Sequence, residues 1–433
     1  MNTSNLSVQN LFSSHRRLSL VAAVLLLTWG GLAAAAPPVV TTVPVSAEDP
    51  LQPHDLISGK PTTLKGAVDE ASIGSTWTWD PGDGSPTVSG VVDPSPTSFV
   101  QTDDVGFTPY FAIWVEHTYT GNDGDLFIAT LTVTNSAGES DSEVYRMVVR
   151  DQTLPVEVNV AIDEALWFMH RNQYRFDGAE VQSNASTTAG TTPMSIWNFP
   201  QTAGTAQGQV SSMAAVVNAF EANGYTETDG PSSPYTETVA RGLRSIIARL
   251  TSQSLSLQWY GRPAGSADNP DVNGNGLGIY VVGHSPAYQQ GMAIDAIVAS
   301  GTPDAVATTG RADIINRTYA SIVQDMVDWY ASAQSDSTAH GGWRYLAYIN
   351  GNGQHDNSSS GWAAIGLLAA EELFGATVPD WVKVRNEVGL EYTDRESSTA
   401  SYDGRHGYTS VTPAWGGFSV TAAAMDQMAM ADI

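Results

Sequence analysis

The sequence predicts a multidomain protein in which an all-β sandwich is followed by an all-α domain. Two observations carry this prediction. The chain has 433 residues, which is more than one ordinary domain holds. Its character also changes near residue 155. Before that point, short alternating runs rich in Val, Thr and Ser lie between Pro, Gly and Asp clusters, and after it apolar residues recur at helical spacing. We therefore expect a domain boundary between Arg150 and Val158.

Residues 1–36 are predicted to form a secretory signal peptide. The basic pair Arg16-Arg17 precedes an apolar run from Leu18 to Leu32, and small residues follow that run. The run is shorter than the ~20 residues that a membrane-spanning helix needs. We therefore expect cleavage and a chain that is secreted or held at the cell surface, not membrane-spanning; an uncleaved membrane anchor is the alternative.

Charge and composition exclude several partners and cofactors. The formal net charge is −26, which argues against nucleic acid and anionic lipid because both attract basic surfaces. The chain has no Cys, so disulfides, thiol catalysis and Cys-ligated metals are excluded. Nothing in the sequence indicates a haem, flavin or nicotinamide cofactor.

The expected sandwich covers residues 38–151, and three of its segments are more specific than the general pattern. They read Trp-Asp-Pro-Gly-Asp-Gly at 79–84, His-Thr-Tyr at 117–119 and Ala-Thr-Leu-Thr-Val-Thr-Asn at 129–135. In this order they resemble the motifs of the polycystic-kidney-disease-type (PKD) domain, an immunoglobulin-like β-sandwich, except that Pro81 replaces a Phe. The resemblance implies a spacer or adhesion module.

Residues 156–433 are expected to be helical, with four related helices among them. The expected helices are 160–169, 209–220, 235–250, 288–299, 312–333, 358–374, 379–392 and 418–430. In four of them a loop leads into a helix of small and apolar residues, and the repeated segments are 209–217, 290–297, 360–370 and 419–425. These Ala-rich helices suit the inner ring of a closed barrel of helical hairpins, and the helices with polar faces suit its outer ring.

The later repeats are similar to a known family. The segments 341–345 (Gly-Gly-Trp-Arg-Tyr), 356–362 and 415–418 resemble the prenyltransferase and squalene-oxidase repeats. The resemblance implies an (α/α)6-type toroid, the scaffold of terpenoid cyclases and protein prenyltransferases. The catalytic residues of those families do not carry over, because the helical part has no Asp-x-Asp-Asp or Asp-Asp-x-x-Asp motif and the chain has no Cys. A shared fold does not imply a shared function.

A ligand site is expected at one end of such a toroid, where the N-termini of the inner helices and the loops before them lie together. Aromatic rings stack on sugar rings, and carboxylates and amides bond hydroxyl groups. The candidate residues are Tyr288, Gln289, Trp343, Arg344, Tyr345, His355, Asp356, Tyr408 and Trp415. Each also has a structural interpretation: the tryptophans would wedge hairpins together, and Asp356 would cap the helix that begins near Gly361.

A calcium site is the remaining candidate. The run 268–276 places oxygen-bearing side chains at alternate positions before a Gly, which is the first half of a calcium loop. The candidate ligands are Asp268, Asp271, Asn273 and Asn275. The second half of the motif is missing, because Val282 occupies the twelfth position, and a tight Asn/Gly turn is the alternative.

Two classes of function remain open from the sequence. The first is a secreted or surface-associated binding or structural protein whose toroid engages an extracellular glycan or a surface protein. The second is a secreted carbohydrate-active enzyme, either a polysaccharide lyase or a glycoside hydrolase. A terpenoid cyclase-like enzyme is a distant alternative.

Overall fold

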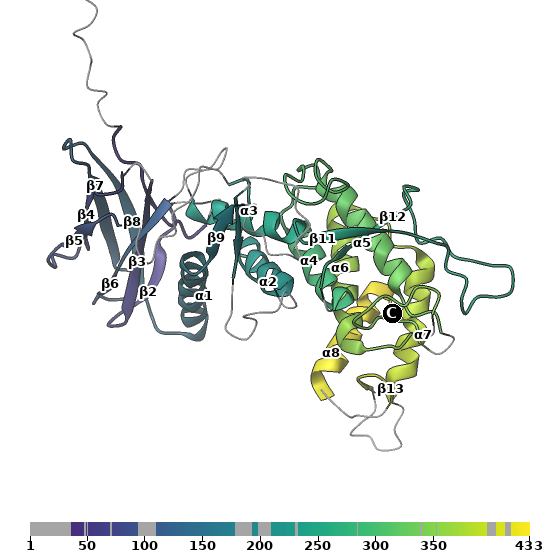
Figure 1. The fold of residues 1–433 in the computed structure, drawn as a ribbon. Helices are drawn as coiled ribbons and strands as arrows, with labels where there is room; N and C mark the ends of the chain where they lie inside the picture. Colours follow the sequence, from purple (N-terminus) through teal and green to yellow (C-terminus); the bar gives the residue numbers. More distant parts are fainter. Residues whose placement is uncertain are drawn as a thin grey trace, which may run out of the picture.

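A computed structural model describes most of the chain after the predicted signal segment. The described residues are 36–46, 49, 51–69, 72–93, 110–177, 193–197, 209–229, 233–283, 285–337, 340–351, 353–395, 404–411 and 417–433. Figure 1 shows a β-sheet region at one end, helix α1 beside it, and the remaining helices extending away from it. The molecule is therefore multidomain and holds both sheets and helices.

The N-terminal region contains two facing sheets. One has the strand order β1-β3-β6, and the other has the order β2-β8-β7-β4-β5. All pairs are antiparallel except β2 with β8, which are parallel. The strands are β1 (Val40–Thr42), β2 (His54–Ile57), β3 (Pro61–Asp69), β4 (Thr76–Asp80), β5 (Val88–Val91), β6 (Tyr110–Thr118), β7 (Leu126–Thr134) and β8 (Ser140–Arg150).

The two sheets enclose an apolar core, as alternating strands require. Leu64, Trp79 and Leu131 are completely buried between them. Gly66 of β3 lies so close to the opposite sheet that a Cβ atom there would fall 2.5 Å from the Leu131 Cδ2 atom. A side chain at this position would separate the two sheets, so the closeness of their packing depends on this glycine.

The C-terminal region is mainly helical, and each of the eight helices expected from the sequence is present. The helices are α1 (Leu154–Arg171), α2 (Gln209–Glu221), α3 (Pro234–Ile247), α4 (Pro286–Ala299), α5 (Tyr319–Ala333), α6 (Asn357–Phe374), α7 (Asp380–Thr393) and α8 (Gly417–Ala431). β8 ends at Arg150 and α1 begins at Leu154, inside the expected boundary interval. No helix in the described part of the chain is long and apolar enough to cross a membrane.

Two helices begin or end differently from the expectation. α5 starts at Tyr319 and not near 312, because Asn316 has a left-handed φ of 67° that interrupts a helix. α3 stops at Ile247 because the chain enters a short strand at Leu250. Three two-stranded pairs in this region were not expected: β9 (Tyr174–Asp177) with β10 (Pro193–Ile196), β11 (Leu250–Ser254) with β12 (Leu277–Val281), and β13 (Asp394–Arg395) with β14 (Arg405–His406).

The four related helices pack side by side in one row. α2 contacts α4, α4 contacts α6, and α6 contacts α8. Glycine allows the close approach: a Cβ atom on Gly291 of α4 would fall 1.8 Å from the Trp362 carbonyl oxygen of α6, and one on Gly361 would fall 2.7 Å from the Ala423 Cβ atom of α8. A six-hairpin ring needs twelve helices, whereas the part of the chain that the structure describes holds eight.

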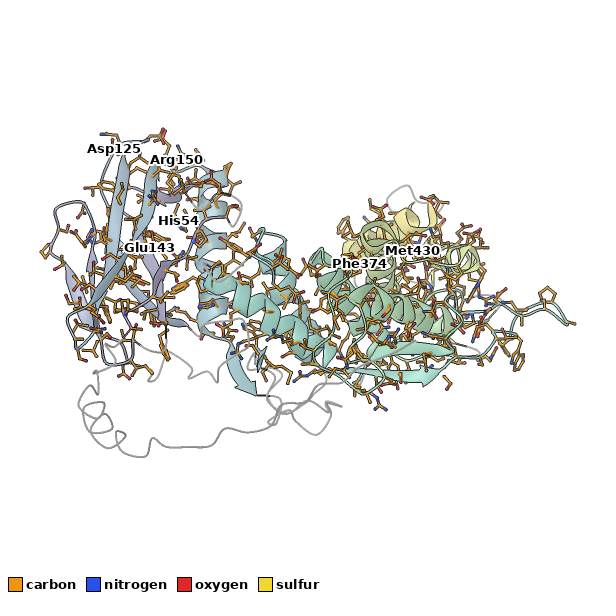
Figure 2. The ribbon with its side chains drawn as sticks, turned by 90° about the horizontal axis from the view of Figure 1, so that it is seen from above. His54, Asp125, Glu143, Arg150, Phe374 and Met430 are labelled. Carbon is orange, nitrogen blue, oxygen red and sulfur yellow. The ribbon has the colours of Figure 1, made fainter. Side chains whose placement is uncertain are left out.

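Helix α1 joins the two regions through a partly buried ionic contact. Lys65 of β3 is completely buried, and its Nζ atom contacts the carboxylates of Asp163 and Glu164 on α1. His54 of β2 contacts the same Asp163, with 3.3 Å between Nδ1 and Oδ2. Figure 2 places His54 where the sandwich meets α1. Two turns further along the same face of α1, the Arg171 guanidinium lies 4.2 Å from a ring of Trp114, which is the cross-strand neighbour of Lys65 in β6.

Candidate functional site

Three tyrosines from separate segments meet beside the N-termini of α4 and α6. The hydroxyl groups of Tyr345 and Tyr408 lie 2.8 Å apart. The ring of Tyr288, in the first turn of α4, lies 6.4 Å from the ring of Tyr345 and 6.3 Å from the ring of Trp362. All three tyrosines are partly exposed. The structure thus brings together side chains that the sequence placed in one candidate site, and the group is called the tyrosine cluster below.

Backbone hydrogen bonds hold the loops of the tyrosine cluster against the helix starts. The Ala287 N–H donates to the Tyr345 carbonyl oxygen at 3.3 Å, which fixes the loop after α5 on α4. The Asn357 N–H donates to the Tyr408 carbonyl oxygen at 2.9 Å, which fixes the loop before α8 on α6. Because these contacts are made by the backbone, they hold the two loops in place without engaging the tyrosine side chains.

The hydroxyl of Tyr408 remains a proton donor at ordinary pH. Burial, then the hydrogen bond with Tyr345 and the nearby carboxylate of Asp356, raise the pKa of Tyr408 well above its usual value. The Arg344 guanidinium lies 5.9 Å from the Tyr345 ring and adds a positive charge beside the cluster. The cluster therefore combines aromatic faces, hydroxyl groups and one cation.

Asp356 has the capping role that the sequence left open as an alternative. It is the N-cap of α6, and its Oδ1 atom accepts hydrogen bonds from the N–H groups of Ser358 at 2.8 Å and Ser359 at 3.3 Å. Its side chain is completely buried. Asp356 therefore stabilises the start of α6 next to the tyrosine cluster, and its buried carboxylate is not accessible to a ligand.

Two more candidates are enclosed in the core. The Trp343 Nε1 atom donates to the Tyr330 carbonyl oxygen at 2.9 Å, and the indole is completely buried. His355 is also completely buried, its Nε2 atom lies 2.6 Å from Asn357 Oδ1, and burial lowers the pKa of His355 to about 4. A Cβ atom on Gly342 would fall 2.2 Å from its Nδ1 atom, so the ring has no room for a ligand.

The two remaining candidates, Gln289 and Trp415, add little to the description of the tyrosine cluster. Gln289 is buried within α4. Trp415 lies outside the described residues. Among the predicted ligand-site residues, His355 carries an imidazole and Asp356 a carboxylate, the groups that most often serve as acid or base, and both side chains are completely buried.

The loop proposed for calcium is folded around its own side chains. Asp271 accepts hydrogen bonds from the Gly274 N–H on Oδ1 and the Gly276 N–H on Oδ2, both at 2.9 Å. Asn273 and Asn275 donate their amide groups to Asp325 of α5, at 2.7 and 2.9 Å. Asp325 thus holds the loop from a helix about fifty positions away in sequence, a contact that the sequence did not predict.

The two other carboxylates near this loop, those of Asp268 and Asp328, lie in different surroundings. Asp268 does not join it, because its carboxylate contacts the Arg262 guanidinium, which also faces Asp336. Burial raises the pKa of Asp328 to about 7, and the like charges of Asp325 and Asp271 add to the effect. Among the described residues, no group of three or more His, Asp or Glu side chains is arranged to hold a metal ion.

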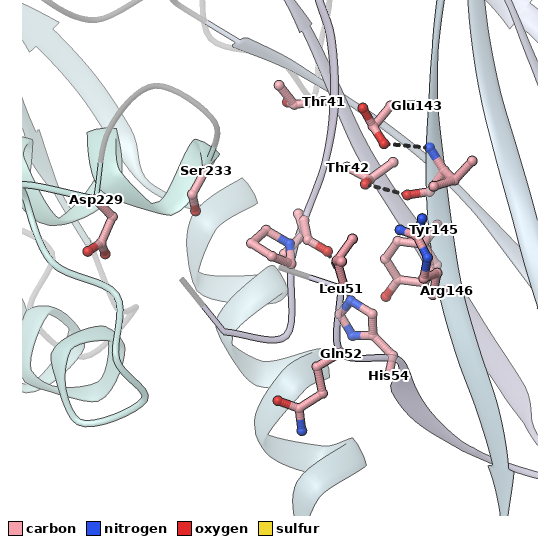
Figure 3. A pocket seen from close by; sticks show the side chains of 13 residues that line it. Thr41, Thr42, Leu51, Gln52, His54, Glu143, Tyr145, Arg146, Asp229 and Ser233 are labelled. Atoms are coloured by element: carbon pink, nitrogen blue, oxygen red, sulfur yellow. Dashed lines mark hydrogen bonds between the residues drawn. The ribbon is translucent and has the colours of Figure 1, made fainter. Parts of the chain in front are cut away.

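Two hollows lie at the junction of the sandwich with the helical region, and no candidate residue from the sequence lines either of them. The first, of about 230 Å³, lies between β1, β8 and the segment before α3 (Figure 3). The second, of about 240 Å³, lies against α1. His54 and Gln52 line both hollows, and the His54 Nε2 atom lies 2.9 Å from the Val43 carbonyl oxygen.

No protein-family model matches the chain, and no curated protein sequence is significantly similar to it.

Proposed function

We propose that this protein is a secreted or surface-associated binding protein whose helical domain engages a glycan at the tyrosine cluster. The observation that carries the proposal is the meeting of Tyr288, Tyr345 and Tyr408 beside two helix N-termini. Partly exposed aromatic faces stack on sugar rings, and hydroxyl and guanidinium groups bond sugar hydroxyls. Export is part of the proposal and rests on the signal pattern in residues 1–36.

The sandwich is proposed to be a PKD-type spacer. Contacts between its three motif segments support this assignment. The Tyr119 hydroxyl donates to the Pro81 carbonyl oxygen at 2.9 Å, and His117 Nε2 lies 2.8 Å from Asp83 Oδ2. Strands β4 and β7, which carry the first and third segments, are hydrogen-bonded neighbours. In this proposal the sandwich, joined to α1 through Lys65, holds the helical domain at a fixed orientation.

The helical domain is proposed to derive from the toroid of the terpenoid cyclase and prenyltransferase families. The support is the row α2-α4-α6-α8, in which the four segments that repeat in the sequence become successive neighbours. The tyrosine cluster lies at the N-terminal end of two helices of this row. In this proposal the tyrosine cluster corresponds to the end of the toroid at which a ligand is expected.

A carbohydrate-active enzyme is the competing proposal, and the tyrosine cluster supports it less well than it supports binding. A tyrosine that acts as a base needs a lowered pKa, whereas the pKa of Tyr408 is raised. His355 and Asp356, the other acid–base candidates, are completely buried. We therefore favour binding without turnover.

The test is a glycan array probed with the chain that lacks residues 1–36. The proposal expects binding to a defined set of glycans, lost in Tyr288→Ala and retained in Trp259→Ala, which removes an aromatic side chain that is 60% exposed elsewhere. Absence of binding to every glycan, or equal loss in both variants, contradicts the proposal. Release of reducing ends or unsaturated uronates from a bound glycan would instead establish the enzyme.

A further inference from the structure

Helix α8 carries apolar side chains on two opposite faces. Other described elements cover one of these faces and leave the other exposed. Val420, Ala424 and Gln427 are buried against the neighbouring elements α6, α7 and β14. The opposite face consists of Phe418, Ala422, Met425 and Ala429, all exposed. Phe418 is 81% exposed and Met425 is 63% exposed. At 100° per residue these four positions form a single stripe on the helix, called the α8 stripe below.

The composition of α8 is that of an interior helix. Asp426 is its single charged residue, whereas a helix on a protein surface normally carries a charged face. α4 and α6 have similar Ala-rich sequences, and each lies between two neighbours of the row. Among the described elements α8 is the last helix of that row, and the α8 stripe is the surface to which the row's helix packing would continue.

We propose that the α8 stripe binds the α8 stripe of a second copy of this chain, in an antiparallel pair related by a two-fold axis. An axis between Ala423 and Ala424 sets Phe418 opposite Ala429 of the second copy and Ala422 opposite Met425 of the second copy. Each large side chain then faces a small one, and each contact occurs twice, as a two-fold interface requires. No other antiparallel register of the stripe places both Phe418 and Met425 opposite an alanine of the stripe.

Charges at the helix ends are complementary in the same arrangement. The Arg405 guanidinium lies 5.1 Å from the Phe418 ring, at the N-terminal end of α8. The antiparallel pairing brings this cation to the C-terminal end of the second α8, where the helix dipole is negative and Asp432 is exposed. This match selects a second copy of the chain over an uncharged apolar partner.

One helix pair buries less than the ~1,200 Å² of a standard interface, so the dimer is expected to form in the micromolar to millimolar range. Sedimentation velocity over that range should show a concentration-dependent dimer of the secreted chain. Ala422→Lys or Met425→Glu, which place a charge in the stripe, should each weaken dimerisation about 100-fold. Leu373→Glu is the matched control, because Leu373 on α6 is 64% exposed but lies outside the stripe. A wild-type chain that stays monomeric, or a dimer that both stripe variants leave unchanged, overturns the proposal.

The register has its own test, because the chain has no native cysteine. An oxidised mixture of Ala422→Cys and Met425→Cys chains should give a disulfide-linked heterodimer, since the two positions face each other. Each variant alone should give little crosslinking, and so should either variant mixed with Leu373→Cys. Circular dichroism and melting of the variants establish that they are folded. A yield in the Ala422→Cys and Met425→Cys mixture no higher than in the Leu373→Cys mixtures contradicts the pairing.

Discussion

The hydroxyl groups of Tyr345 and Tyr408 lie 2.8 Å apart, although the two residues are separated by 63 positions. Tyr345 belongs to the loop before α6, and Tyr408 to the segment before α8. Their contact closes the tyrosine cluster over the N-terminus of α6, where Asp356 caps the helix. The candidate glycan site therefore depends on loops that the row of helices holds together.

Replacement of Asp356 should mainly lower the stability of the fold, because its carboxylate caps α6. Asp356→Ala removes the oxygen that accepts the Ser358 and Ser359 N–H groups, and should lower the free energy of unfolding by about 1–2 kcal/mol. Asp356→Asn keeps an accepting oxygen and should lose less. Asp380→Ala, an exposed first-turn carboxylate of α7, is the control. Urea unfolding measures all three, and equal stability of Asp356→Ala and wild type would refute the capping role.

The contact between Lys65 and α1 should make the coupling of the two regions sensitive to acid. Burial alone would raise the pKa of Asp163, but the nearby charges of His54 and Lys65 outweigh it and hold the pKa well below its usual range. The stabilisation is therefore present above the unfolded pKa of about 4 and is lost as the pH falls further. Thermal melting from about pH 5 down to about pH 2 should show this loss in wild type and a smaller one in Asp163→Asn.

Two matched lysine variants, Lys65→Met and Lys60→Met, test the same contact. Lys65 is completely buried and Lys60 is exposed. Lys65→Met removes the cation that Asp163 and Glu164 share and leaves Asp163 in contact with His54, so it should destabilise the protein by about 2 kcal/mol, less than for a pair with both partners fully buried. Lys60→Met should change stability by less than about 0.5 kcal/mol. Similar melting temperatures for the two variants would show that the contact does not join the regions.

Asp328 should produce the opposite pH dependence. Because burial raises its pKa to about 7, the folded chain keeps a proton that the unfolded chain releases above about 4. This contribution is complete below the unfolded value and is lost as the pH rises through about 7. Asp328→Asn should flatten the fall in stability between pH 5 and 8. An unchanged slope in urea unfolding would mean that Asp328 is ionised throughout.

Calcium should stabilise the chain if the loop at 271–276 binds it, as the sequence pattern proposes. With a dissociation constant on the order of 10⁻⁴ M, a few millimolar calcium should add about 2 kcal/mol. Thermal melting with EDTA and with calcium should separate wild type from Asp271→Asn, with exposed Asp304→Asn as the control. An identical melting temperature of wild type in both conditions would show that the hydrogen bonds of Asp271 and Asp325 hold the loop without calcium.

Local sequence patterns predicted much of the fold because they report local physics. The repeated Ala-rich segments became α2, α4, α6 and α8, since small residues permit the close packing seen at Gly291 and Gly361. The start of α5 could not be predicted, because the left-handed conformation of Asn316 is set by its surroundings and not by a glycine or proline signal.

The sequence predicted part of the candidate site, because only part of it has a local signal. The aromatic loops indicated Tyr288, Tyr345 and Tyr408, which the structure brings together. The burial of His355 and Trp343 depends on tertiary packing, which a sequence pattern does not report. The contacts of Lys65 with Asp163, and of Asn273 with Asp325, join distant segments and gave no local signal.

The central claim is tested most directly by the affinity of Tyr345→Ala for the glycan that wild type binds best. Calorimetric titration should show a loss of about tenfold to a hundredfold, because one stacking face and one hydroxyl are removed. The melting temperature should fall by only a few degrees, since the Tyr345 side chain is partly exposed. An affinity equal to that of wild type, measured on a folded Tyr345→Ala chain, would contradict the assignment of the tyrosine cluster as the glycan site.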